Sequence, residues 1–211
     1  LKNIIEPNAV DLAGSAVGII KPKSRLSLGD KLTSGDHILL IESSGIHANG
    51  LTLARSIADK LPKGYATKLT DGSLYGETLL IPTHIYAKAV TAMFDAEIDI
   101  HYMVNITGHG WRKLMRANRD FSYVIDKVPT VPPIFEFIQK HSGNSDQEMY
   151  ENFNMGAGFA IFLPEAEVIK AQDILKRFKF KSWHAGHVES AKKVEIKAKG
   201  LVLRGETLAI R

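Results

Sequence analysis

The sequence predicts an α+β fold in which helices pack against a mixed β-sheet. Helical and strand-like segments interleave irregularly, and the chain ends in consecutive strands, a pattern that differs from the regular alternation of a parallel α/β fold. At 211 residues and 45% hydrophobic content, the chain is long enough to bury a substantial core.

The first part of the chain reads as a connector. Residues 16–20 have the composition of a strand that has lost its neighbours, and a basic stretch containing proline and glycine follows through Gly35. We place a domain boundary near residues 29–35. Because the chain does not open on Met and runs directly into a strand-like stretch, we expect it to be the remainder of a longer protein.

A strand, a turn and a helix come next. Residues 37–41 form a continuous apolar run of strand length that ends at a Ser-Ser-Gly turn signal. Leu53, Ile57 and Leu61 then recur at helical spacing. Asn49 is placed to cap the first turn of this helix by accepting a backbone N–H bond.

Later elements follow from the same two hydrophobic periodicities. The predicted helices cover residues 82–94, 133–141, 146–153 and 165–178, with a short helix near Trp111. The predicted strands cover residues 100–106, 121–125, 158–163, 183–188, 193–198 and 201–203.

Composition narrows the class of protein. No apolar run approaches the roughly 18 to 20 residues that a membrane span needs, and the opening segment lacks the layout of a signal peptide. The net charge of +4 is scattered, which argues against a nucleic-acid-binding stripe. Cysteine is absent, which excludes disulfides and a thiol nucleophile. We therefore expect a cytoplasmic protein with no nucleic-acid or membrane partner. The mild positive excess suits a small phosphorylated substrate, but solvated surface lysines give the same charge and are the better explanation, so the charge carries little weight.

Residues 43–50, Ser-Ser-Gly-Ile-His-Ala-Asn-Gly, are the most informative stretch. Free N–H groups at a helix start attract phosphate, and glycines let the backbone approach closely. His47 is able to donate a hydrogen bond to phosphate or to shuttle a proton, while Asn49 can orient a polar substrate group. The alternative from residue types alone is an ordinary capped connection.

Two further polar turns flank strands, at residues 107–110 and 154–158. Each alone is a weak signal, because single glycines usually mark turns. The three turns become a candidate site if they converge in space. No P-loop, dinucleotide fingerprint, serine elbow or carboxylate pair is present.

The chain contains eight histidines, of which His184 and His187 form the closest pair. Strand alternation would place these two on opposite faces, and no carboxylate completes a familiar ligand set. We predict no metal site in this chain.

In order and spacing, these stretches resemble the phosphoribosylformylglycinamidine cyclo-ligase (aminoimidazole ribonucleotide synthetase) family. The resemblance runs from about residue 11 to 188. It is carried by residues 11–18, by residues 43–50 against Ser-Ser-Gly-x-His-Ser-Asn-Gly, by residues 82–86 against Pro-Thr-Arg-Ile-Tyr, by residues 105–110 against His-Ile-Thr-Gly-Gly-Gly, and by residues 148–158 against Glu-Met-Tyr-x-x-Phe-Asn-Met-Gly-x-Gly.

This resemblance implies the carboxyl-terminal half of a homodimeric enzyme that uses ATP to close the imidazole ring of formylglycinamidine ribonucleotide in purine biosynthesis. Residues 1–30 would be the remnant of the amino-terminal domain with a connector, and residues 31–211 the carboxyl-terminal domain. ATP and Mg²⁺ would bind mainly to the amino-terminal domain, so the isolated half should be inactive. The carried-over residues are His47 and Asn49 as catalytic groups, and Ser44, Gly45, Gly50, Thr107, Gly108 and Asn154 as substrate-binding groups.

Three positions depart from the family pattern. His109 replaces the middle glycine, so its side chain is expected to obstruct close phosphate approach or a positive φ. Asn105 replaces a histidine, and His84 replaces an arginine. These departures keep two alternatives open: a non-catalytic or divergent module that binds a phosphorylated metabolite, and another ATP-using member of the superfamily.

Overall fold

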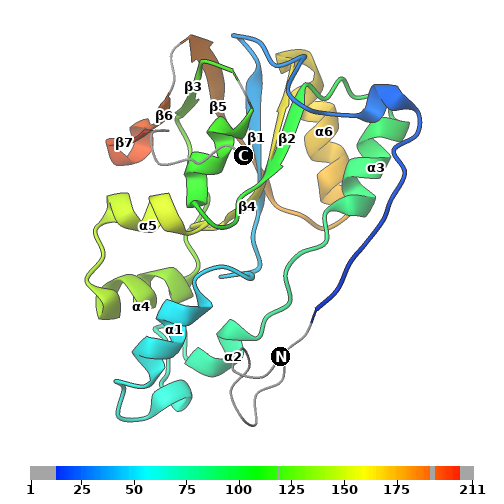
Figure 1. Cartoon of the computed structure of the whole chain (residues 1–211). Helices are drawn as coiled ribbons and strands as arrows, with labels where there is room; N and C mark the ends of the chain where they lie inside the picture. Colours follow the sequence, from blue (N-terminus) through cyan, green and yellow to red (C-terminus); the bar gives the residue numbers. More distant parts are fainter. Residues whose placement is uncertain (1–12, 118, 191–192, 205–211) are drawn as a thin grey trace, which may run out of the picture.

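The computed structural model describes residues 13–117, 119–190 and 193–204. Seven strands form a single mixed sheet in the order β2-β4-β1-β5-β3-β6-β7, with helices on both faces and a helical extension beyond one end (Figure 1). The predicted α+β class is confirmed.

The strands are β1 (His37–Glu42), β2 (Tyr102–Asn105), β3 (Phe121–Ile125), β4 (Ala157–Leu163), β5 (Ser182–Ser190), β6 (Lys193–Ile196) and β7 (Leu201–Arg204). The α-helices are α1 (Leu51–Ala58), α2 (Tyr75–Leu79), α3 (Ala87–Asp95), α4 (Pro133–Ser142), α5 (Asp146–Asn152) and α6 (Glu165–Arg177). Short 3₁₀ helices are η1 (Lys23–Arg25), η2 (Gly64–Ala66), η3 (Gly110–Arg116) and η4 (Lys197–Lys199).

Strand β1 is an interior strand of the sheet. It pairs antiparallel with β4 on one side and with β5 on the other, and the side chains of Ile38, Leu39, Leu40 and Ile41 are fully buried. A strand covered on both faces reads as a continuous apolar run, which explains its sequence. β3 and β6 form the parallel pair that makes the sheet mixed.

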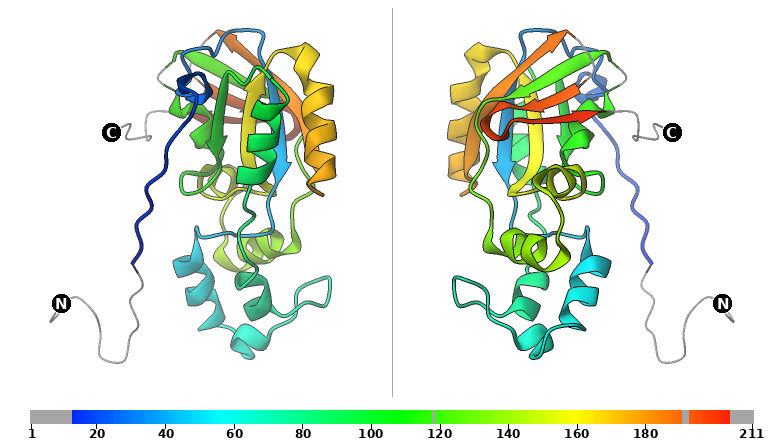
Figure 2. Two further views of the ribbon diagram at one scale, coloured as in Figure 1. Left: turned by 90° about the vertical axis from the view of Figure 1, so that its right-hand side faces the viewer. Right: turned by 90° about the vertical axis from the view of Figure 1, so that its left-hand side faces the viewer.

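Each face of the sheet has its own core. Leu39 and Ile41 pack with Met93 of α3 and Val168 of α6. These two helices lie side by side over one face of the sheet (Figures 1 and 2). The other face packs against η3 and helices α1, α4 and α5, with Trp111 among its largest fully buried side chains. The helices α1, α2 and α4 extend beyond the end of the sheet (Figure 1).

Some predicted elements differ from the observed ones. Residues 16–20 form no strand; Val17 and Ile19 are exposed, and these residues pair with nothing in the described part of the chain, so they have no ladder. The helix expected from residue 82 begins at Ala87, because residues 82–86 run instead along the loop after β1. Helix α2 was not predicted, and the strand from Lys193 ends at Ile196.

The two close histidines lie on the same face of the sheet, contrary to prediction. The register pairs His187 with His37 and His184 with Leu39, because a bulge between them absorbs one residue of β5. A bulge reverses the alternation of side chains beyond it. His184 Nε2 consequently lies 2.5 Å from His37 Nδ1, whereas His187 pairs with Glu189.

None of the helices in the described ranges is long and apolar enough to cross a membrane.

The bulge gives a test of the sheet register. A Cβ at Gly186 would overlap the backbone carbonyl of Val124 on the neighbouring strand, and a backbone contact cannot rotate away. We expect Gly186→Ala to lower the free energy of unfolding by about 2 to 3 kcal/mol, as overpacking does. Urea denaturation measures this. The matched control is Gly18→Ala, since nothing lies within 4 Å of a Cβ there; an equal loss in both variants would contradict the register.

Candidate functional site

Sheet topology brings the three polar turns together. β4 lies between β2 and β1 and is antiparallel to both. The start of β4 therefore lies beside the ends of β1 and β2, at the same end of the sheet. The turns at residues 43–50, 107–110 and 154–158 are attached at these three strand ends, so the convergence that would make them a site is present.

Asn154 ties the turns to one another. Its side chain is 3% exposed; Nδ2 donates to Gly45 O at 2.9 Å, and Oδ1 accepts from the backbone N–H of Gly156 at 3.0 Å. Its own carbonyl accepts from Trp111 Nε1 at 2.8 Å. The carboxamide thus fixes the backbone of the first turn against the third, and the indole of η3 anchors the second turn to them.

Glycines allow the close approach of the turns. A Cβ at Gly50, whose φ is 86°, would overlap the ring of Phe153. A Cβ at Gly108 would lie 3.2 Å from Asn49 Oδ1. The two glycines therefore leave room for the Phe153 ring and the Asn49 side chain, and larger residues at these positions would force the turns apart.

Asn49 does not cap the helix as predicted. The N-cap residue of α1 is Gly50, which has a left-handed φ of 86°, and no side chain caps the helix. Asn49 Nδ2 instead donates to the carbonyl of Asn152 at 2.5 Å, because the end of α5 lies beside the loop. The first N–H groups of α1 are consequently not consumed by a capping side chain.

His47 is buried at the base of the first turn. It is 7% exposed and adopts a left-handed φ of 58°. The backbone N–H of Ser44 donates to His47 Nε2 at 3.0 Å, so the proton of the neutral ring resides on Nδ1. Burial, and then the proximity of His84, lowers the pKa of His47 to about 4. The imidazole is neutral at pH 7 and presents a hydrogen-bond donor, Nδ1–H.

The segment 82–86 forms a wall beside His47, and two of its contacts were not foreseen. Ser44 Oγ donates to Pro82 O at 2.7 Å, and the Tyr86 hydroxyl donates to Glu42 O at 2.8 Å. His84 lies edge-on to His47, with ring centroids 6.3 Å apart. Residues 82–86 resemble the family string Pro-Thr-Arg-Ile-Tyr, which marked the segment as a candidate. The loop that it contacts could not be predicted from the sequence.

His109 adopts a left-handed backbone conformation. Its φ is 74°, so the expectation that a side chain would prevent a positive φ is wrong; histidine is among the residues that tolerate the left-handed region. The exposed ring borders a hollow of about 530 Å³ at the start of α1. The polar residues that line this hollow are Asn49, Thr52, Ser56, His109, Asn144 and Asn152.

The predicted site residues thus differ in how deeply they are buried. Ser44, Asn49, Gly50, Thr107 and Gly108 are half-buried, whereas Gly45, His47 and Asn154 are buried. Asn105 is exposed at the end of β2. Over the described ranges, no group of three or more His, Asp or Glu side chains is arranged to hold a metal ion.

Comparison with known proteins identifies the family. The family model described as "AIR synthase related protein, C-terminal domain" matches residues 33–199, which is most of the chain. The chain belongs to this family. The converging turns are therefore those of an AIR synthase related carboxyl-terminal domain.

Curated relatives carry one name. A phosphoribosylformylglycinamidine cyclo-ligase of Methanococcus vannielii is 37% identical over 190 residues, covering 90% of this chain and 53% of the relative. The one of Methanocaldococcus jannaschii is 38% identical over 181 residues, covering 85% of this chain and 51% of the relative. The chain spans about half the length of these relatives.

Solved structures agree on the fold. The crystal structure of hydrogenase maturation protein HypE superposes with a TM-score of 0.55 at 18% identity, covering 91% of this chain and 59% of that chain. A structure of HypE in complex with ATP gives the same TM-score at 17% identity, covering 85% and 52%. The same α+β fold is therefore found in a protein of another name.

The clamp at Asn154 predicts a large loss of stability on truncation. Asn154→Ala leaves the buried Gly45 carbonyl and Gly156 N–H without these partners, and each unsatisfied group costs about 1 to 3 kcal/mol. We expect urea denaturation to give a total loss of about 2 to 4 kcal/mol. Asn144→Ala is the control, since that side chain makes only a 3.9 Å contact with Met149 Sδ; a comparable loss in the control would contradict the clamp.

The buried imidazole predicts an acid-sensitive contribution to stability. The folded state keeps His47 neutral to about pH 4, whereas the unfolded state gains a proton below about 6.5. Its contribution is therefore present above pH 6.5 and falls by about 3 kcal/mol as pH drops to 4. Unfolding free energies of wild type and His47→Gln at pH 7, 5.5 and 4 should converge as pH falls. His141→Gln, on the exposed face of α4, should run parallel to wild type; parallel curves for His47→Gln would contradict a buried neutral His47.

Proposed function

We propose that the chain is the substrate-side half of an ATP-dependent cyclo-ligase that converts formylglycinamidine ribonucleotide to aminoimidazole ribonucleotide in purine biosynthesis. The family membership and the names of the relatives support the reaction. The observation that carries the proposal is that three strings that resemble the cyclo-ligase pattern, far apart in sequence, meet at the same end of the sheet. A shared role in one cleft accounts for that arrangement.

The reaction needs activation of an unreactive oxygen. ATP, when bound, supplies the phosphoryl group that turns the amide oxygen into a leaving group, which a nitrogen of the same substrate displaces as the ring closes. This half of the enzyme would hold the ribonucleotide in the folded geometry that brings nitrogen and carbon together. The substrate carries a phosphate, so an anion-binding surface is the first requirement on this half.

The start of α1 fits that requirement. Its N–H groups lack a side-chain cap, and they open into the polar hollow that His109 borders. Uncapped N–H groups and the positive end of the helix dipole favour an anion. We propose that a phosphate binds at the start of α1 near Gly50 and Gly108, with the half-buried Ser44 and Thr107 as neighbouring polar groups, and that Gly45 and Asn154 keep the loop in shape.

His47 is proposed to act as a hydrogen-bond donor. Its Nε2 accepts from Ser44 N–H, and its low pKa disfavours the imidazolium, so it is poorly suited to take up a proton at pH 7. The Nδ1–H can instead donate to an oxygen that gains negative charge. Asn49 is held against the Asn152 carbonyl through Nδ2, which leaves its Oδ1 to orient a substrate donor.

ATP and Mg²⁺ are proposed to bind mainly to the amino-terminal half. The described residues fit a substrate phosphate better than a metal ion, because they offer N–H groups and amides without a clustered set of acidic ligands. We further propose that residues 1–30 join the two halves, that residues 31–211 are the carboxyl-terminal domain, and that the enzyme is a cytoplasmic homodimer.

The competing candidate is a module that binds a phosphorylated metabolite without turnover. Two of the three departures from the family pattern, His109 in the second turn and Asn105 at the end of β2, are exposed, where they would contact a ligand. Divergence at these positions would change the ligand and leave the fold intact. Another ATP-using member of the superfamily is the remaining alternative.

The deciding experiment is a ring-closure assay on the full-length polypeptide with ATP and formylglycinamidine ribonucleotide, in which ADP and the aminoimidazole product are measured. Stoichiometric product is the expected result. His47→Ala should lower kcat/KM by about a hundredfold or more, as loss of a charge-stabilising donor does, whereas His141→Ala should stay within about twofold. A folded wild type without turnover would favour the binding module, and ATP consumption with another substrate alone would favour another superfamily member.

A further inference from the structure

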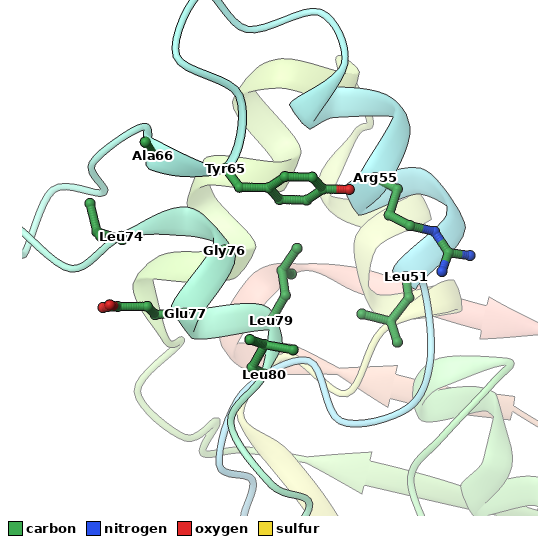
Figure 3. Close-up of a pocket in the computed structure, with 9 residues that line it drawn as sticks. All are labelled: Leu51, Arg55, Tyr65, Ala66, Leu74, Gly76, Glu77, Leu79 and Leu80. Atoms are coloured by element: carbon green, nitrogen blue, oxygen red, sulfur yellow. The ribbon is translucent and has the colours of Figure 1, made fainter. Parts of the chain in front are cut away.

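An apolar groove lies at the helical end of the molecule, away from the three turns. It has a volume of about 580 Å³ and lies between α1, η2 and α2. Its lining residues are Leu51, Arg55, Tyr65, Ala66, Leu74, Gly76, Glu77, Leu79 and Leu80. Leu51, Leu79 and the Tyr65 ring face a common space, with Leu80 at the rim (Figure 3).

The groove continues into an exposed apolar strip. Leu80 is 82% exposed and Ile85 is 80% exposed, with the exposed Ile81 between them. A contiguous patch of exposed large apolar side chains usually marks an interaction surface. The groove and strip are called the α2 surface below.

The charges around the groove indicate a protein partner. Arg55 and Glu77 stand at opposite sides of the groove (Figure 3). Neither forms an ion pair within the described ranges. An apolar centre flanked by polar groups is the usual anatomy of a protein–protein interface, whereas a small ligand would leave the adjoining strip uncovered.

The chain itself points to the partner. Residues 13–20 leave the body of the domain and run beside it toward the level of α1 and α2, as both views agree (Figures 1 and 2). Val17 and Ile19 on this segment are exposed as well. The matched family domain is carboxyl-terminal, and the relatives are about twice as long, so their other half precedes the part that corresponds to this chain.

We propose that the α2 surface is where the amino-terminal half of the cyclo-ligase polypeptide packs, with an apolar side chain of that half filling the groove. The inference rests on the proposed function. Interfaces between domains of one chain bury roughly 600 to 1,500 Å², and the groove, the strip and the segment 13–20 supply apolar area for such an interface.

This docking would also reach the candidate site. The strip leads from Leu80 into Pro82, whose carbonyl accepts from Ser44 Oγ, and then to His84 beside His47. A half that covers the strip therefore covers the open side of segment 82–86. Docking at the α2 surface and closure of the site over His47 become the same event.

The absence of cysteine from the chain allows a direct test by thiol labelling. Leu80→Cys places a thiol on the α2 surface, and Ile169→Cys, on α6 and 74% exposed, is the matched control. In the isolated chain both should react with a maleimide at similar rates. In the full-length polypeptide, Leu80→Cys should react at least about tenfold more slowly while Ile169→Cys is unchanged, with peptide mass spectrometry assigning the labelled site.

Three results would overturn the proposal. Equal labelling of Leu80→Cys in the isolated chain and in the full-length polypeptide would mean that the amino-terminal half does not cover the groove. If Leu80→Cys already reacts slowly in the isolated chain, and its labelling rate rises when the protein is diluted, a second copy of the chain covers the surface. Slowing of Ile169→Cys to the same extent would remove the specificity. Because labelling requires no turnover, a failed ring-closure assay and a failed docking proposal are distinguishable.

Discussion

The carboxamide of Asn154 is the interaction on which the candidate site depends. It binds the backbone of the loop after β1 and of the turn before β4, and the indole of Trp111 binds its carbonyl. These bonds are buried, where an unsatisfied partner is costly. The sheet sets which turns can meet, and this one side chain sets how they meet.

Burial then determines the chemistry available at the site. His47 lies low in the loop with its Nε2 already used by Ser44, so the fold selects a neutral tautomer and one free donor. A site of this kind relies on positioned dipoles more than on mobile protons. The uncapped start of α1 adds dipoles of the same sign, and together they make one positive edge without a cluster of charged side chains.

Sequence alone predicted the elements whose burial is uniform and missed features set by distant contacts. The buried runs of β1 and β4 and the amphipathic α6 were read correctly, because periodicity reports burial. The short α2 packs against η2, and residues before the late start of α3 run along the loop after β1. Periodicity does not encode either contact. The bulge opposite His37 reversed the expected faces of His184 and His187. The three turns were found as motifs, but their convergence, and the use of Gly50 in place of Asn49 at the helix start, required the sheet order and the position of Phe153.

The place of β1 between β4 and β5 has a consequence for biosynthesis. These two partners come late in the chain, so a ribosome completes this apolar strand long before either neighbour exists. Until then Ile38, Leu39, Leu40 and Ile41 have no sheet to join, and an unpaired apolar strand is prone to aggregate. The sheet around β1 is therefore completed only after β5 has been synthesised.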